Sequence, residues 1–476
     1  MVPQTRFSAE ESMNRTIAAV ALAGLFGTFA PAAASAQTSA PTFSKDVAPI
    51  LYKNCTNCHR PGEIGPMALV TYKDARPWAK SIATRVGNGS MPPWHADDPT
   101  HQKFSNDRSL SEADRNVIVK WASGGAPEGN PKDLPALPKF ADGWMMGTPD
   151  AVFPMQESYP IPASGTLDYK FFEIPTNLTE DKWLQAFEIR PGDRSVVHHV
   201  IAYVRAPTPP RDSAAPAASA PQPSAPRPAP PFAFAQGMRR PADAPPPSRG
   251  DEQNDRPAKQ NPGGWLAAYA PGYSLRVYAP GTAIKIPKGA IITVQMHYTT
   301  TGKATSDRST IGVKYASEPP KTELVVVPLS NANFVLKAGT ADTRVDAEMT
   351  LNTDVTLWSA IPHTHVRGKR WQVEATYPDG RTEMILNVPK YDFNWQTDYI
   401  FAQALTLPKG TKLKTSAWYD NSTANKSNPD PTKEVWWGDQ TWEEMMYTGL
   451  TFSIDAPPQS TAVSRSRRCR YLKVRS

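Results

Sequence analysis

The sequence has few of the residues that cross-link or anchor a protein. It contains only three cysteines in 476 residues, too few for a disulfide framework, so stability must come from core burial and bound cofactors. Beyond the first 36 residues no apolar run reaches the length of a membrane-spanning helix. A basic stripe interleaved with aromatic residues is also missing, and the formal net charge is only +7, which argues against nucleic acid as a partner.

Proline, by contrast, is abundant, with 50 residues, which indicates extended linkers between folded parts. A chain of 476 residues is also too long for a single core and predicts two or three domains. The richest stretch, residues 206–262, holds proline, alanine and serine with almost no apolar periodicity. We expect it to form a solvated insertion in a loop. A basic tail occupies residues 458–476.

Residues 1–36 have the order of a secretory signal peptide. Arg15 precedes an apolar run over residues 17–30, and small residues then end at Ala34-Ser35-Ala36. An uncleaved anchor is the alternative, but the apolar run is short for a membrane span. We therefore expect a periplasmic or secreted protein with no membrane span after cleavage.

Residues 41–127 carry the pattern of a small helical domain. Ser111 stands three residues before Asp114, as in a capping box, and Ile118 and Trp121 then form an apolar face that ends before Gly124. Residues 128–143 follow as a proline-punctuated linker. From residue 144 the texture changes to short β-type runs, which we expect at 195–204, 290–298, 324–327, 356–361 and 413–419. Such a series is typical of antiparallel sandwiches or barrels.

A c-type haem attachment signature lies at Cys55-Thr56-Asn57-Cys58-His59. Two thiols three residues apart can reach the two vinyl groups of one haem, and the adjacent histidine then presents a ring nitrogen to the iron. A redox or zinc Cys-x-x-Cys pair that happens to precede a histidine is the alternative. No second cysteine pair exists to complete a zinc site. We therefore expect a covalent haem c held by Cys55, Cys58 and His59.

The sixth haem ligand is expected to be Met91, in the segment Ser90-Met91-Pro92-Pro93-Trp94. Flanking prolines hold the loop rigid, and a methionine–histidine pair raises the reduction potential, as suits an electron carrier. Met67 and His95 are the competing ligands, and core filling is the other role open to Met91. The order of signal, Cys-x-x-Cys-His and Met-Pro-Pro-Trp resembles small class I-type cytochrome c domains.

Five of the eight histidines fall in the β region, in three groups. His363 and His365 are two residues apart, so on a strand they share a face and can chelate one metal. His198 and His199 are adjacent and would point to opposite faces, so joint chelation needs a bulge or an unusual ring orientation. His297 can complete one site and a methionine the other, and these donors suit copper. Ordinary buried or surface histidines are the alternative for each group.

Four motifs together resemble the copper type II, ascorbate-dependent monooxygenases, the family of peptidylglycine α-hydroxylating and dopamine β-monooxygenase. They occur in the family's order and are Val196-Val197-His198-His199-Val200, Val294-Gln295-Met296-His297-Tyr298, Pro362-His363-Thr364-His365 and Glu443-Glu444-Met445-Met446. The resemblance implies two jelly-roll-like β domains, residues 144–325 and 326–457, each binding one copper across a cleft. The expected fold class is therefore multidomain, a small all-α cytochrome c domain followed by two all-β antiparallel jelly-roll-like sandwich domains.

The resemblance also assigns ligands to two copper ions. His198, His199 and His297 would hold the electron-transfer copper. His363, His365 and Met445 would hold the oxygen-activating copper and form the catalytic set. Met446 is the adjacent alternative to Met445, since a one-residue shift in a strand reverses the face.

Several family features are replaced here. Animal members carry disulfides that this β region cannot form, and Ile361 stands where the peptidylglycine enzymes have a carboxylate-binding arginine. Tyr447 and Gly449 replace their asparagine and tyrosine after the methionine ligand. The resemblance therefore implies copper chemistry but not peptide amidation. Arg367 and Lys369 could meet an anionic substrate group, but we expect them at a solvated strand end.

These parts predict a copper-dependent monooxygenase that hydroxylates a C–H bond of a small organic substrate with O₂. A tethered haem has a high effective concentration at the copper region, so it would pass single electrons to the first copper after reduction by an external donor. One alternative is a periplasmic haem and copper electron-transfer protein without oxygenase activity. In another, electrons flow from a substrate through copper to the haem and an external acceptor.

Overall fold

The structure is a computed structural model that describes residues 40–98, 103–140, 143–207, 264–270 and 273–454, with the backbone of 232–234. The predicted signal peptide 1–36, most of the insertion 206–262 and the basic tail 458–476 lie outside the described residues. From Pro41 onward the chain groups into one compact unit.

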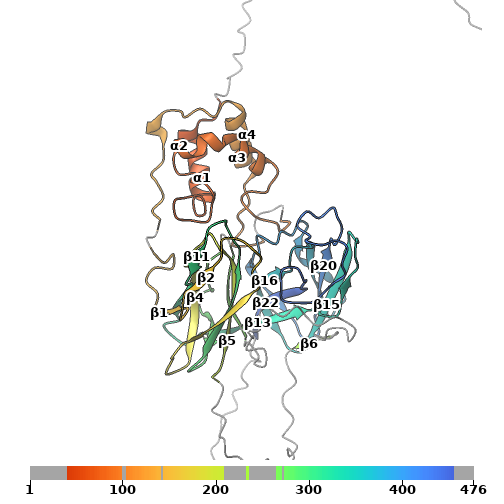
Figure 1. Ribbon diagram of the computed structural model, residues 1–476. Helices are drawn as coiled ribbons and strands as arrows, with labels where there is room; N and C mark the ends of the chain where they lie inside the picture. Colours follow the sequence, from red (N-terminus) through yellow and green to blue (C-terminus); the bar gives the residue numbers. More distant parts are fainter. Residues whose placement is uncertain are drawn as a thin grey trace, which may run out of the picture. The chain divides into compact units, whose positions relative to one another are not determined.

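Short helices occupy the N-terminal part of this unit (Figure 1). They are the π-helical turn η1 (Phe43–Val47), α1 (Ala48–Asn54), α2 (Tyr72–Ala75), the 3₁₀ turn η2 (Arg76–Trp78), α3 (Ala79–Gly87), α4 (Glu112–Ser123) and the 3₁₀ turn η3 (Pro131–Asp133). The predicted capped helix is confirmed, because Ser111 Oγ accepts a hydrogen bond of 3.1 Å from Asp114 N and Gly124 ends α4. Ile118 and Trp121 are buried as expected.

Strands make up most of the remaining chain (Figure 1). They are β1 (Ala151–Pro154), β2 (Tyr159–Ile161), β3 (Lys170–Pro175), β4 (Lys182–Arg190), β5 (Val197–Arg205), β6 (Phe232–Phe234), β7 (Gly264–Tyr269), β8 (Leu275–Val277), β9 (Thr282–Ile286), β10 (Ile291–Tyr298), β11 (Thr305–Asp307), β12 (Thr310–Tyr315), β13 (Thr322–Ser330), β14 (Val335–Leu336), β15 (Thr343–Leu351), β16 (Val355–His363), β17 (Gly368–Thr376), β18 (Thr382–Val388), β19 (Tyr399–Leu407), β20 (Lys412–Tyr419), β21 (Val435–Trp436) and β22 (Tyr447–Ile454). All five predicted strands are present, as β5, β10, β13, β16 and β20.

Three larger sheets organise these strands. The nine-stranded sheet has the order β1-β12-β4-β9-β13-β22-β16-β19, with β8 beside β4. A four-stranded sheet runs β3-β10-β5-β7, and a five-stranded sheet runs β18-β17-β20-β15-β6. β11 pairs with β2 and β14 with β21. The apolar faces of these sheets enclose two β cores, one around Leu184 and Val294 and one around Val373 and Phe452.

The predicted fold class is wrong in two respects. The described residues show no separate all-α domain, since their few helices span at most 12 residues within one compact, strand-rich unit. The β region is also not two independent sandwiches. β13 pairs in parallel with β9 and antiparallel with β22, so backbone hydrogen bonds carry one sheet across the expected boundary at residue 325.

The segment after α3 enters a β core. Trp94 and Phe104 are buried there, and Trp94 packs edge-to-face on Tyr399 with ring centroids 5.1 Å apart. Phe104 also forms an isolated antiparallel bridge with Phe401 of β19. This anchoring explains why contacts do not separate the helical segment from the sheets. Among the described residues no helix is both long and apolar enough to cross a membrane.

Candidate metal centre

A β-bulge brings the two adjacent histidines together. In the pairing of β5 with β10, His297 lies opposite His199 and Tyr298 opposite Val197, so His198 is the extra residue. A bulged residue is released from the strict alternation of the strand. The sequence-based condition for joint chelation, a bulge at this pair, is therefore confirmed.

Three ring nitrogens converge at this bulge. The Nδ1 atoms of His198 and His199 are 3.0 Å apart, and each lies 3.3 Å from Nδ1 of His297. His199 and His297 are buried, whereas His198 is half-buried. One small ion among the three nitrogens would be within coordinating distance of all of them. Among the described residues these histidines form a group whose ligand atoms all lie within 4.8 Å of one another.

Two of the three outer nitrogens of this trio have partners in the protein, whereas the buried Nε2 of His199 has no hydrogen-bond partner among the described residues. His198 Nε2 lies 3.3 Å from Asn394 Oδ1, and His297 Nε2 lies 3.3 Å from Thr441 Oγ1. A proton on Nε2 leaves the Nδ1 lone pair free to face the centre. Burial and the neighbouring imidazoles hold the pKa of His199 and His297 well below its usual value. Burial therefore favours the neutral form of His199 and His297, which is the form that binds a cation.

In the second pair, His363 and His365, the protein contacts Nδ1 instead of Nε2. His363 Nδ1 lies 2.6 Å from Gln396 Oε1, and His365 Nδ1 lies 3.0 Å from the carbonyl oxygen of Glu443. A carbonyl only accepts, so His365 carries its proton on Nδ1 and has a bare Nε2. That buried Nε2 has no hydrogen-bond partner among the described residues. Burial lowers the pKa of His363 to about 4 and of His365 to about 3.

Glu444 fixes the turn that follows His363. Its buried carboxylate accepts hydrogen bonds from Thr364 Oγ1, from His365 N at 2.8 Å and from Arg367 N at 2.7 Å. Burial raises the pKa of this carboxyl group, and the hydrogen bonds oppose that effect. The arrangement locks the position of the His365 ring relative to β22.

The two methionines before β22 have different surroundings. Met446 is fully buried in a hydrophobic core, whereas Met445 is half-buried. The pairing of β16 with β22 ends at His363 and Tyr447, and Met445 lies two residues before Tyr447, next to the Glu443 and Glu444 groups that contact His365. Met445 N also donates to the Glu444 carboxylate that binds His365 N. These observations favour Met445 over Met446 as a thioether donor.

Both histidine groups lie close together. The rings of His199 and His363 have centroids 6.3 Å apart. The buried Tyr169 ring lies between the groups, 4.7 Å from His297 and 6.1 Å from His365. The loop before β19 adds Phe393, whose ring stacks on His198 at 5.2 Å. The imidazoles therefore sit in an aromatic surrounding that limits access of water.

In the segment Cys55–His59, which the sequence predicts to attach haem, one histidine ring nitrogen has a backbone partner. His59 Nδ1 lies 3.1 Å from the carbonyl oxygen of Met67, which leaves Nε2 bare. Burial raises the pKa of Cys55 to about 12 and also raises that of Cys58. A β-carbon on Gly65 would lie 2.7 Å from His59 Nδ1, so glycine is needed there.

The sixth-ligand candidates differ in their surroundings. Met91 is half-buried in the loop after α3, where its N–H donates to Arg85 O at 3.1 Å. Met67 instead packs against the core of the helical segment. His95 has a buried Nδ1 without a hydrogen-bond partner among the described residues, and burial lowers its pKa. No hydrogen bond or ring contact joins Met91 to His59 in the described chain, so its ligand role stays a prediction.

Arg367 and Lys369, both expected at a solvated strand end, have different surroundings in the structure. Arg367 is not at a solvated strand end, because it is 2% exposed and donates to Asn421 Oδ1 and Trp442 O. Lys369 is exposed as expected and pairs with Asp342 at 3.2 Å. Ile361 packs over Gly449, where a β-carbon would lie 2.7 Å from Ile361 Cγ2.

Sequence reasoning missed the residues that orient the imidazoles. Asn394 and Gln396 come from the loop before β19, Thr441 from the segment before β22 and Tyr169 from the residue before β3. No spacing rule links them to the histidines, since they are 33 to 196 residues from their partners. Glu443 and Glu444, by contrast, stood within a quoted motif.

Comparison with protein-family models and with curated proteins gives no match. Among solved structures the chain is similar to that of infectious bursal disease virus Gx strain, with 8% identity over 64% of this chain and 72% of that chain and a TM-score of 0.17. A Paenibacillus xanthan lyase matches with 9% identity over 68% of this chain and 28% of that chain, with a TM-score of 0.16. At such TM-scores these likenesses carry no argument, so function has to be inferred from the site.

Proposed function

We propose that the protein is a copper-dependent monooxygenase that hydroxylates a C–H bond of a small organic substrate with O₂, using electrons delivered through a c-type haem on the same chain. The observation that carries the proposal is the convergence of three imidazole Nδ1 atoms, from His198, His199 and His297, within 3.3 Å of one another. A second pair of imidazoles lies beside this trio.

The donor sets fit copper. The first set is three neutral imidazoles, and the second is two imidazoles with a thioether from Met445, which favours Cu(I). Copper held by these side chains would supply one-electron redox chemistry. The buried, partnerless Nε2 of His365 is a donor that a metal would satisfy.

The chain's own groups do the positioning. Gln396 and the carbonyl of Glu443 hold the second imidazole pair by Nδ1, and Asn394 holds His198 by Nε2. The Tyr169 ring packs beside His297, and the Phe393 ring stacks on His198. Ligands fixed in this way lose little freedom when a metal binds, and they change little between its oxidation states.

The haem motif is the second part of the proposal. Cys55 and Cys58 would form the thioether bonds and His59 Nε2 would face the iron. The salt bridge between Glu63 and Arg194, 2.6 Å long, joins the loop after this motif to the loop before His198. That contact supports direct electron delivery from the haem to the first histidine group.

The test begins with metal and haem analysis of the purified protein. We expect two copper ions and one covalent haem per chain, and loss of one copper ion in His297→Ala. His95→Ala, outside both histidine groups, serves as the matched control and should keep two. Copper content unchanged in His297→Ala would contradict the assignment.

Oxygen uptake then separates the enzyme from an electron carrier. With a reductant and a panel of organic compounds, we expect O₂ consumption that depends on the compound and yields a hydroxylated product. Reversible reduction of haem and copper without such a product would instead favour an electron-transfer protein.

A further inference from the structure

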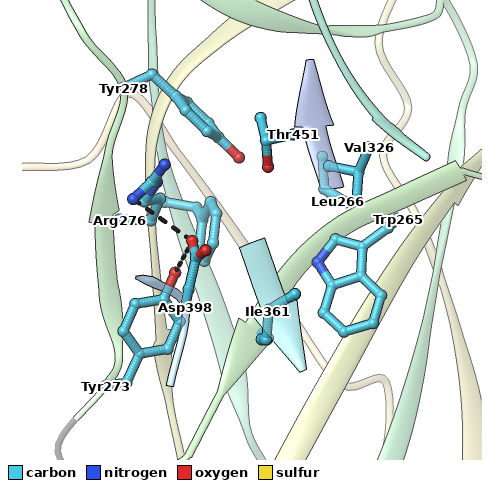
Figure 2. A pocket seen from close by; sticks show the side chains of 11 residues that line it. Trp265, Leu266, Tyr273, Arg276, Tyr278, Val326, Ile361, Asp398 and Thr451 are labelled. Atoms are coloured by element: carbon cyan, nitrogen blue, oxygen red, sulfur yellow. Dashed lines mark hydrogen bonds and ion pairs between the residues drawn. The ribbon is translucent and has the colours of Figure 1, made fainter. Parts of the chain in front are cut away.

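A small cavity lies beside the strand that carries His363 (Figure 2). Its volume is about 20 Å³, which is room for one water-sized group. The polar part of its lining comes from Tyr273, Arg276, Tyr278, Asp398 and Thr451, and the apolar part includes Trp265 and Ile361. None of the polar residues belongs to the histidine groups.

The polar part holds a buried ion pair that is incompletely satisfied. Arg276 is 5% exposed and Asp398 8%, and their Nη1 and Oδ2 atoms are 3.4 Å apart. Tyr273 donates to Asp398 Oδ2 at 3.3 Å, and Arg276 Nη2 reaches Ser359 Oγ at 3.5 Å. Arg276 Nη1 and Asp398 Oδ1 have no hydrogen-bond partner among the described residues. Such buried atoms cost about 1–3 kcal/mol each when they stay unpaired.

Arg276 Nη1, which has the 3.4 Å ion pair but no hydrogen bond among the described residues, and Asp398 Oδ1 together select for one kind of ligand. A group that both accepts from Arg276 Nη1 and donates to Asp398 Oδ1 satisfies the two atoms at once. A hydroxyl or a primary carboxamide can do this. A carboxylate would meet the charge of Asp398, and an ammonium group the charge of Arg276, in a site that water screens poorly. The pair therefore favours a neutral head group.

The cavity and the second histidine pair share one face of two paired strands. Ser359, Ile361 and His363 alternate along β16, so they point to the same side. Ser359 contacts Arg276, and four residues of strand separate it from His363 by roughly 13 Å. The face of β16 that lines the cavity at Ile361 therefore also carries His363.

The wall between the two ends is apolar and aromatic. Gly449 lies opposite Ile361 and Tyr447 opposite His363. Trp265 stacks on Tyr447 with ring centroids 5.7 Å apart, and Tyr447 is 6.3 Å from the His363 ring. This surface suits the body of an aromatic or aliphatic molecule.

We propose that the Arg276–Asp398 cavity is the recognition end of the substrate site, and that it takes a hydroxyl or carboxamide group borne on an apolar body. This inference rests on the proposed monooxygenase function. It assigns the substrate class as neutral alcohols, phenols or amides, whose reacting carbon lies on the His363 side. Anionic substrates are excluded by Asp398, although Arg276 alone would attract them.

Binding to metal-free protein tests the inference separately from catalysis. We choose four probes with one ring, namely benzyl alcohol, benzamide, benzoate and benzylamine, and measure their Kd at pH 7 by calorimetry. The two neutral probes should bind at least about tenfold more tightly than the two charged ones. Because no copper is needed, a failure here is distinct from a failure of the metal and oxygen-uptake tests.

Substitutions of the pair give the sharper result. Arg276→Met should weaken benzamide binding at least about tenfold, whereas the exposed Arg381→Met should leave it unchanged. Asp398→Asn removes the repulsive charge, so benzoate should bind at least about tenfold more tightly than it binds the parent protein. A misfolded variant would not gain affinity. Equal, weak binding of all four probes, with no gain of benzoate affinity in Asp398→Asn, would mean a water-filled structural cavity and overturn the proposal.

Discussion

Glu63 Oε2 and Arg194 Nη1 lie 2.6 Å apart, and both side chains are largely buried. Glu63 follows the haem-motif residue His59 by four positions, and Arg194 precedes His198 by the same number. Arg60 also pairs with Glu63, at 2.9 Å. One short charge cluster therefore connects the candidate haem loop to the strand that carries the first histidine group.

Removing this contact should slow electron delivery. Arg194→Gln leaves Glu63 paired with Arg60 only. Loss of about 1 kcal/mol from the contact between the candidate haem loop and the segment before β5 corresponds to a roughly fivefold lower rate of electron transfer. We expect that reduction of copper by pre-reduced haem, followed by stopped-flow absorbance, slows by about this factor.

The matched control for that experiment lies at the other end of β5. Arg205 forms a comparable ion pair with Glu173, 2.8 Å long. Arg205→Gln should leave the rate unchanged. Equal rates in both variants would show that the Glu63 contact does not serve the transfer.

Much of the candidate site followed from the sequence, because chelation imposes spacing. The adjacency of His198 and His199 called for a bulge or an unusual ring orientation, and the bulge is present, whereas β16 ends at His363, so strand alternation does not place His365. The residues that orient the imidazoles had no comparable spacing signal in the sequence. Gln396 and Tyr169 reach the imidazoles only through tertiary packing, which spacing does not encode.

The fold class illustrates the same limit. Local periodicity predicted β5, β10, β13, β16 and β20, since each strand carries its own pattern. The parallel pairing of β13 with β9 joins strands about 40 residues apart and has no local signature. The sequence therefore did not predict that one sheet continues across residue 325.

The two methionines before β22 allow a matched test of the second site. Methionine to leucine keeps volume and apolarity and costs less than about 1.5 kcal/mol, but it removes the thioether. Met445→Leu should lose Cu(I) from the second site and abolish product formation. Met446→Leu should retain both, because its side chain lies in the core.

X-ray absorption of the reduced protein provides the measurement. A copper–sulfur contribution should be present in the parent protein and in Met446→Leu and absent in Met445→Leu. The reverse pattern would assign the ligand to Met446.

Glu444 should be needed for the geometry of the second site. Glu444→Gln replaces one accepting oxygen with an amide NH₂, so Arg367 N or the Thr364 and His365 donors lose a partner. We expect a loss of about 1–3 kcal/mol in unfolding free energy and weaker copper binding at the His363 pair. Denaturant titration and copper titration measure these effects.

The exposed Glu434, which pairs with Lys337, offers a control for that substitution. Glu434→Gln should change neither stability nor copper affinity by a measurable amount. Copper affinity at the first group, His198, His199 and His297, should also survive in Glu444→Gln. Loss at both sites together would indicate general unfolding rather than a local role.

Buried imidazoles should make the metal-free protein sensitive to acid. Burial lowers the pKa of His363 to about 4, whereas histidine in an unfolded chain titrates near 6.5. Between these values the unfolded chain binds more protons than the folded one, so stability falls as the pH falls. The stability that His363 contributes is fully present above pH 6.5 and is lost as the pH approaches 4.

His363→Gln removes this titration, so its stability should depend less on pH over the same window, by on the order of 3 kcal/mol. Thermal unfolding of metal-free protein at half-unit steps from pH 7 to 4 measures the difference. A constant difference in stability between the variant and the parent protein does not matter, because only the slope of stability against pH reports proton uptake by His363. Parallel curves for the two proteins would mean that His363 takes up its proton at the same pH in the folded and the unfolded chain, which would contradict a pKa lowered by burial.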